Sequence, residues 1–248
     1  MMTFRHTHIY VPATLGLWLG LFVDSNYIAT KLMYNQWLAS AIVVLTFFWV
    51  YSQVTKSIKL IMLYGLILGA LGESFFSLVL GMYTYRLENI PLYVPPGHSI
   101  IFVGIYYLMK EPFVQKYQDL IIRVLFSLMI IYSSFWLLYF NDLFGFLCVL
   151  TIVWVLYHYP VNRLFFLLMF VMVACAENLG TLLQCWQYPS IWFNQFQWIP
   201  SASPPSGISI FYSAFDIGCL WCYKQLNRQS WNRMRSIQRT ANQKLIQP

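Results

Sequence analysis

The sequence predicts an all-α membrane protein, a polytopic bundle of about eight transmembrane helices. Hydrophobic residues make up 59% of its 248 residues and charged residues only 9%. Because soluble domains carry about 25% charged residues, this chain cannot cover a water-facing surface. Aromatic residues account for 19% of the chain, and Trp and Tyr concentrate where a bilayer meets water. We therefore expect the membrane lipid bilayer to be its main partner and residues 1–248 to form a single integral membrane domain.

Apolar segments separated by short polar links give the expected helices, since a bilayer core needs roughly 20 mostly apolar residues per crossing. They lie at about residues 10–28, 34–53, 58–80, 94–110, 120–140, 143–158, 162–186 and 206–223. The first is expected to be a retained helix, because Met1–Val11 has no small-residue cleavage site of a signal peptide. The fourth is short, so it could be tilted or partly re-entrant. It begins at Pro95-Pro96-Gly97, and proline fits in a first helical turn, where its missing N–H would be unpaired anyway.

The basic residues predict the orientation. Eight crossings place both termini on one side of the membrane. With that side cytoplasmic, only Lys31 and Arg86 lie outside, and 13 basic residues lie inside. These are Arg5, Lys56, Lys59, Lys110, Lys116, Arg123, Arg163, Lys224, Arg228, Arg233, Arg235, Arg239 and Lys244. Such asymmetry follows the positive-inside rule, so we expect a plasma (inner) membrane protein with both termini cytoplasmic and residues 224–248 as a basic cytoplasmic tail. The net charge of +7 then needs no nucleic acid partner.

Two similar stretches predict an internal repeat. Glu73 is followed by Gly81-Met82-Tyr83-Thr84-Tyr85 and Pro95-Pro96-Gly97-His98, and Glu177 is followed by Cys185-Trp186-Gln187-Tyr188-Pro189 and Pro204-Pro205-Ser206-Gly207. The halves would be about residues 1–118 and 119–223, a parallel 4+4 repeat. Both loops, 81–97 and 187–205, would then be non-cytoplasmic, with the two glutamates just beneath them.

Carboxylates inside apolar segments are costly and are treated as functional candidates. Glu73 and Glu177 are therefore the first candidates for acid/base catalysis. Asp24 joins them because two helices share a pattern: Gly16 and Gly20 precede Asp24 as Gly65 and Gly69 precede Glu73. These small-residue stripes could bring Asp24 close to Glu73, so that one of the two acids keeps a proton. Alternatively, the glycines are packing contacts and the acids are structural hydrogen-bonding groups.

Other side chains could complete such a site. His98 could shuttle protons or simply lie at the interface where its helix begins. Tyr83, Tyr85, Trp186 and Tyr188 could anchor the loops at the interface or form the walls of a site for an apolar ligand.

Asp216 is expected to face the bundle interior, because an acid within an apolar helix needs a partner, and it is a further candidate for substrate binding. The four histidines are scattered, so we expect no metal and no cofactor. The five cysteines lie mostly in apolar segments, and Cys219-x-x-Cys222 is interpreted as small apolar filling.

The motifs resemble one known family. Gly72-Glu73, Gly81-Met82-Tyr83-Thr84-Tyr85 and Ile90-Pro91-Leu92-Tyr93-Val94-Pro95 are similar to elements of the polytopic membrane carotenoid-biosynthesis family that includes carotenoid hydratases. The resemblance covers about 30 residues. It implies acid-catalysed chemistry on an isoprenoid double bond.

Three functional hypotheses follow. The chain could be a hydratase- or isomerase-like enzyme acting on a lipid-soluble, isoprenoid-type substrate at a carboxylate site near the non-cytoplasmic face. It could be a small-solute or proton-coupled transporter in which Asp24, Glu73, Glu177 and Asp216 form a route. It could also be a non-catalytic scaffold whose acids only join helices. The sequence leaves the oligomeric state open.

Overall fold

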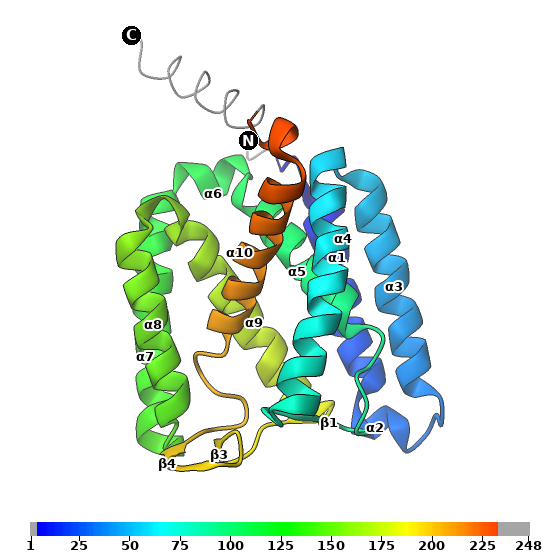
Figure 1. The fold of residues 1–248 in the computed structure, drawn as a ribbon, viewed down its shortest axis with the longest axis vertical. Coiled ribbons are helices and arrows are strands. Elements are labelled where there is room, and N and C mark those ends of the chain that lie inside the picture. Colours follow the sequence, from blue (N-terminus) through cyan, green and yellow to red (C-terminus); the bar gives the residue numbers. More distant parts are fainter. Residues whose placement is uncertain (1–3, 233–248) are drawn as a thin grey trace.

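Eight helices of 16 or more residues run between the two ends of the molecule in the computed structural model, which describes residues 4–232 (Figure 1). They are α1 (Thr7–Asp24), α3 (Asn35–Gln53), α4 (Lys56–Glu73), α5 (Val94–Met109), α7 (Gln118–Phe140), α8 (Leu143–His158), α9 (Arg163–Leu182) and α10 (Ser209–Leu226). Each lies at one of the expected segments. The all-α fold class is thus confirmed, and α10 includes the first residues of the expected tail. The tail residues from 233 onward lie outside the described part.

Short elements connect these helices. At one end lie α2 (Asn26–Ala29), β1 (Thr84–Tyr85), β2 (Trp186–Gln187), β3 (Ile191–Trp192) and β4 (Phe196–Pro200), and at the other lies α6 (Pro112–Lys116) (Figure 1). A 3-10 turn, η2 (Pro160–Asn162), precedes α9, and a π-helix, η1 (Ser74–Val79), extends α4 directly after Glu73. π-Helical turns are rare and often lie at functional sites. The sequence did not predict the strands, which form two antiparallel pairs, β1 with β2 and β3 with β4.

Three of the helical stretches are long and apolar enough to cross a membrane on their own. They are Lys56–Val79, Gln118–Phe140 and Pro160–Leu182. Two further apolar helices, Val94–Met109 and Leu143–His158, are shorter. Much of the outer surface of the bundle is apolar, as on α7, where Leu138 is 77% exposed. Membrane crossing by these three stretches therefore agrees with the predicted protein class.

The glycine stripes pack against other helices and not against each other. A Cβ atom at Gly20 would lie 2.5 Å from Val43 of α3, and one at Gly16 would overlap Thr46 of the same helix. On α4, a Cβ atom at Gly65 would overlap Ser99 of α5, and Gly69 approaches the Pro95 backbone. The stripes therefore join α1 to α3 and α4 to α5. The interpretation as packing contacts agrees with this arrangement, and a direct meeting of the two stripes does not.

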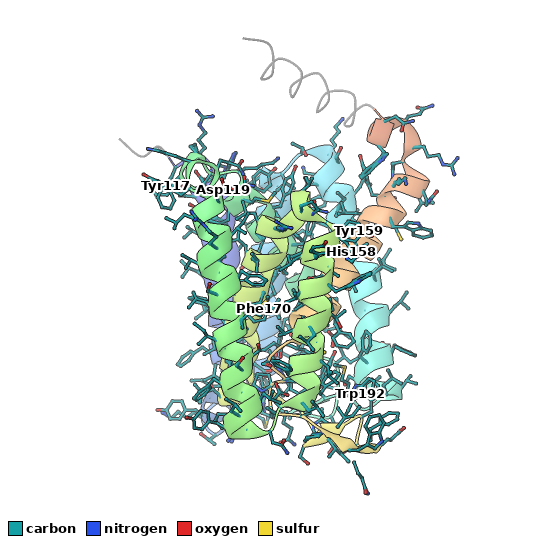
Figure 2. The ribbon with its side chains drawn as sticks, turned by 90° about the vertical axis from the view of Figure 1, so that its left-hand side faces the viewer. Tyr117, Asp119, His158, Tyr159, Phe170 and Trp192 are labelled. Atoms are coloured by element: carbon teal, nitrogen blue, oxygen red, sulfur yellow. The ribbon has the colours of Figure 1, made fainter. Side chains whose placement is uncertain are left out.

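A second apolar core joins α7, α8 and α9. Its buried members include Met129, Val149 and Phe170. Phe170 lies about midway along the bundle, between Tyr117 near one end and Trp192 at the other (Figure 2). Helix pairing differs between the halves: α1 packs on α5, whereas α7, which would be its counterpart, packs on α9. The structure therefore shows no 4+4 repeat of helix packing in residues 4–232.

Charge separates the two ends of the bundle. The end formed by the start of α1, α4, α7 and α9 and the finish of α5 and α10 contains nine of the eleven lysine and arginine residues between positions 4 and 232. Of these eleven residues, only Lys31 and Arg86 lie at the end that carries the strands. Asp24, Glu73, Asp142 and Glu177 are buried toward that second end, which the loops 81–97 and 187–205 cover (Figure 1).

Gly65→Ala should destabilise the fold, because the new methyl group would push aside Ser99, whose hydroxyl donates to the Met62 carbonyl at 2.9 Å. We expect a loss of about 1–3 kcal/mol, typical of overpacking in a dense interior. The matched control is Gly72→Ala on the same helix, where no atom lies within 4 Å of the new methyl group. Thermal unfolding in detergent would compare the two, and equal unfolding temperatures would contradict this account of the stripe.

Candidate functional site

Glu73 lies at the last residue of α4 and accepts three hydrogen bonds. Tyr83 and Tyr85 each donate a phenol O–H to Oε2, at 2.7 and 2.6 Å. His98 lies 2.8 Å from Oε1 through its Nε2 atom. The glutamate is only 6% exposed. Because a buried carboxylate needs donors to replace water, these three side chains stabilise Glu73 in its buried position.

Glu177 on α9 has a similar arrangement. Trp186 Nε1–H and the Tyr188 phenol donate to Oε2, at 2.8 and 2.9 Å, and the Tyr212 phenol donates to Oε1 at 2.7 Å. The glutamate is 3% exposed. Gly180, one turn further along α9, leaves the space that the indole ring of Trp186 occupies.

The spacing of the aromatic residues explains how two donors reach one carboxylate. In an extended segment, residues two apart point to the same side. Tyr83 and Tyr85 flank Thr84, as Trp186 and Tyr188 flank Gln187, and these segments pair through β1 and β2. The pairing also adds a hydrogen bond from Arg86 N–H to the Cys185 carbonyl at 2.9 Å. One small sheet therefore supplies donors to both glutamates.

The two carboxylate clusters touch each other. The rings of Tyr83 and Tyr188 lie 5.3 Å apart between centroids, and the rings of His98 and Tyr212 lie 4.6 Å apart. Both glutamates line one cavity of about 100 Å³ between α1, α4, α5, α9 and α10. That volume holds several water molecules or a short segment of an apolar chain. The sequence had left open whether the glutamates share a cavity, and in the structure they do.

The loop phenols keep their protons. Burial, and next the negative charge of Glu73, raise the pKa of Tyr83 and of Tyr85 well above their usual values. Burial and the charge of Glu177 do the same to the pKa of Tyr188. At physiological pH these groups therefore act as hydrogen-bond donors and not as phenolates, which suits them to hold carboxylates in place.

Asp24 belongs to a neighbouring cluster. Its Oδ1 forms an ion pair with Arg86 at 2.6 Å, and its Oδ2 accepts from the Tyr93 phenol at 2.8 Å. Asn35 also contacts Arg86 through its side-chain oxygen, at 3.1 Å. Asp24 is fully buried. Its partners differ from those of Glu73, so the hydrogen bonds do not form the expected carboxylate pair.

Asp216, the remaining candidate for substrate binding, lies apart from the cavity lining. It is 3% exposed on α10, one turn after Tyr212, and its Oδ2 atom has no hydrogen-bond partner in residues 4–232. The sequence correctly indicated an inward-facing position. The partner that burial would require is not found among these residues.

Several residues of this region were missed by the sequence interpretation. Tyr212 and Tyr93 lie in apolar stretches where a tyrosine resembles an interface anchor. Arg86 directly follows the Tyr-x-Tyr segment. It is one of the two basic residues predicted to lie outside, at the same end as Asp24, and this shared location was the signal that could have paired them. Asp142 caps α8 and accepts three backbone N–H groups, from Gly145, Ala202 and Ser206, at 2.7–3.1 Å. It thereby fixes the second loop, and only tertiary structure identifies it.

Within residues 4–232, no three His, Cys, Asp or Glu side chains gather as metal ligands would. Comparison of the chain with protein-family models, with curated proteins and with solved structures gave no match.

Arg86→Gln should destabilise the protein by about 3–5 kcal/mol, the usual cost of leaving one member of a buried ion pair without its partner. Equilibrium unfolding in detergent would measure this loss. Adding Asp24→Asn should recover much of it, because the amide needs no counter-charge. A double variant as unstable as the sum of its single variants would contradict a direct interaction between Asp24 and Arg86.

Proposed function

We propose that this chain is a multi-pass membrane enzyme that moves protons on a lipid-soluble, isoprenoid-type substrate. The observation that carries the proposal is the shared cavity, in which two buried glutamates and a histidine face mostly apolar and aromatic walls. Proton transfer needs only positioned acid and base groups. An apolar substrate suits a cavity with so few polar atoms. The motif resemblance to carotenoid-biosynthesis proteins adds the isoprenoid class.

Glu73 and His98 form the donor side of the proposed reaction. The carboxylate orients the imidazole through Nε2, while Nδ1 of His98 has no hydrogen-bond partner in the described part of the chain. An imidazole that a carboxylate orients in this way can act as a proton donor or acceptor in catalysis. In the reaction, the pair adds one proton to an alkene carbon, and the neighbouring carbon becomes a carbocation.

Glu177 forms the acceptor side. Three donors hold its carboxylate, and a carboxylate beside a developing positive charge stabilises it. Removal of a proton from an adjacent carbon by Glu177 completes a double-bond shift, with no net change in protons. Addition of water to the carbocation, followed by loss of a proton, completes a hydration instead. The Tyr212 phenol donates a hydrogen bond to Glu177, and its ring contacts the ring of His98. Tyr212 therefore lies on the path by which the proton can return from Glu177 to His98.

In this proposal, all eight long helices cross the membrane. The five long helices that are shorter or less apolar lie alongside the three that are long and apolar enough to cross a membrane on their own (Figure 1). The basic end then faces the cytoplasm by the positive-inside rule. The paired glutamates lie toward the opposite face of the plasma membrane. The similar loops around the two glutamates support an origin from a duplicated half.

A second candidate is a proton-coupled transporter. Asp216 favours it, because the Oδ2 atom of this acid has no hydrogen-bond partner among residues 4–232, and the residue lies on α10 between the glutamate cavity and the basic end. On the same buried face, Ser213 precedes it and Tyr223 follows, the latter donating to Ser57 at 2.9 Å. These groups provide polar positions at successive depths, as a proton route requires.

The enzyme proposal is tested by mass spectrometry of total lipid and pigment extracts. Cells lacking the protein are compared with cells expressing the native form, Glu73→Gln or Glu177→Gln. The native form should shift a lipid by one water mass or alter its double-bond position, seen by a changed retention time. Each variant should lose on the order of 100-fold or more of that product, since acid or base catalysis contributes at least that much.

The control is Glu88→Gln, which removes an exposed acid from the loop 81–97 and should leave the lipid product unchanged. Identical extracts from cells with and without a folded, inserted native protein would contradict the enzyme proposal. That result would favour the transporter candidate.

The orientation is tested with single cysteines at Glu88 and Gln225, in a background where the five native cysteines are alanine. Both positions are exposed at opposite ends of the bundle. A membrane-impermeant maleimide added to intact cells should label position 88 and leave position 225 unlabelled until the cells are opened. The reverse pattern would place the glutamate cavity near the cytoplasm.

A further inference from the structure

The charge balance of the cavity is negative on the side of Glu177. Glu73 is faced by His98, a group that can carry positive charge. Glu177 is held only by neutral donors, an indole and two phenols. No lysine or arginine from the described residues lines the cavity. Arg86, which follows one of the donor segments, is already paired with Asp24 at 2.6 Å.

The walls around Glu177 favour a positive charge as well. Aromatic rings surround the cavity on several sides, among them Phe76, Tyr83, Tyr188, Phe211 and Phe215. The faces of such rings carry partial negative charge and attract cations, with the largest effect where water is excluded.

Hydrogen bonds alone do not neutralise a carboxylate. Neutral donors replace the water that Glu177 loses on burial, but they supply no positive charge to balance the carboxylate when it is ionised. A positively charged group entering the cavity would gain from both the carboxylate and the rings. An uncharged group of the same shape would gain only the apolar contact.

We propose that this cavity binds the head of a lipophilic organic cation of the substituted-ammonium class, with Glu177 as its counter-ion. The inference deepens the proposed function, because a carbocation intermediate and a stable ammonium head have the same charge and a similar shape. The volume of about 100 Å³ limits the bound part to a small head with the start of its chain. The rest of an elongated ligand lies outside the cavity.

The test is equilibrium binding of tritiated decyltrimethylammonium to the purified full-length protein in lipid nanodiscs. We expect saturable binding at one site. The uncharged carbon isostere of this probe, 2,2-dimethyldodecane, should compete at least about 30-fold less well. Glu177→Gln should weaken binding by a similar factor, the lower range for loss of one partner in a buried charge pair. Competition by the isostere equal to that by the unlabelled cation would overturn the proposal, and this comparison needs no variant.

Glu88→Gln is the matched control. It also replaces a glutamate by glutamine at the same end of the bundle, but Glu88 is exposed and does not line the cavity. Its binding should equal that of the native protein. A loss in Glu88→Gln as large as in Glu177→Gln would overturn the assignment to Glu177. Size-exclusion chromatography of each variant establishes that it is folded.

The result also separates this inference from the proposed function. Cation binding without any change in the cellular lipids would retain the ammonium site and reject the proton chemistry. A lipid product without selective cation binding would retain the enzyme and reject the ammonium ligand.

Discussion

The need to satisfy carboxylates buried in an apolar bundle governs the rest of this structure. Glu73 and Glu177 each lie near the end of a long apolar helix and each accept three hydrogen bonds from side chains. A buried acid without donors would cost several kcal/mol, so the loops after both helices must return to cover them. The two paired strands are too short to add much stability of their own. Their role is to direct two aromatic donors to each glutamate.

The same requirement explains the neighbouring acids. Asp24 holds the first loop through Arg86 and Tyr93, and Asp142 holds the second loop through the backbone N–H groups of Ala202 and Ser206. The carboxylates of these two aspartates are used to hold the two loops in place. The glutamates differ, because they border open space. The division between structural and candidate catalytic acids thus depends on access to the cavity and not on burial.

Sequence patterns predicted what depends on local periodicity. Apolar runs identified the eight long helices, and the Tyr83-x-Tyr85 and Trp186-x-Tyr188 spacings identified side chains that the structure brings to one site. The predictions that failed depended on which helices pack against each other, and local periodicity does not specify this. The stripe at Gly65 and Gly69 shows that a helix has a close partner, but small residues do not specify which helix that is, and the partner is α5. Tyr212 was missed for the same reason, since only the packing of α10 against α9 brings it to Glu177.

The uneven distribution of charge along the bundle links orientation to chemistry. Basic residues gather at one end, where they can contact water and lipid headgroups, and the four loop-covered acids are buried toward the other. Arg86, the only arginine at that end among residues 4–232, is paired with Asp24. An ion pair between Arg86 and Glu177 would have cancelled the charge in the cavity. Keeping the arginine one cluster away leaves Glu177 with neutral donors, so the cavity keeps a charge that only a ligand, a transferred proton or a reaction intermediate can balance.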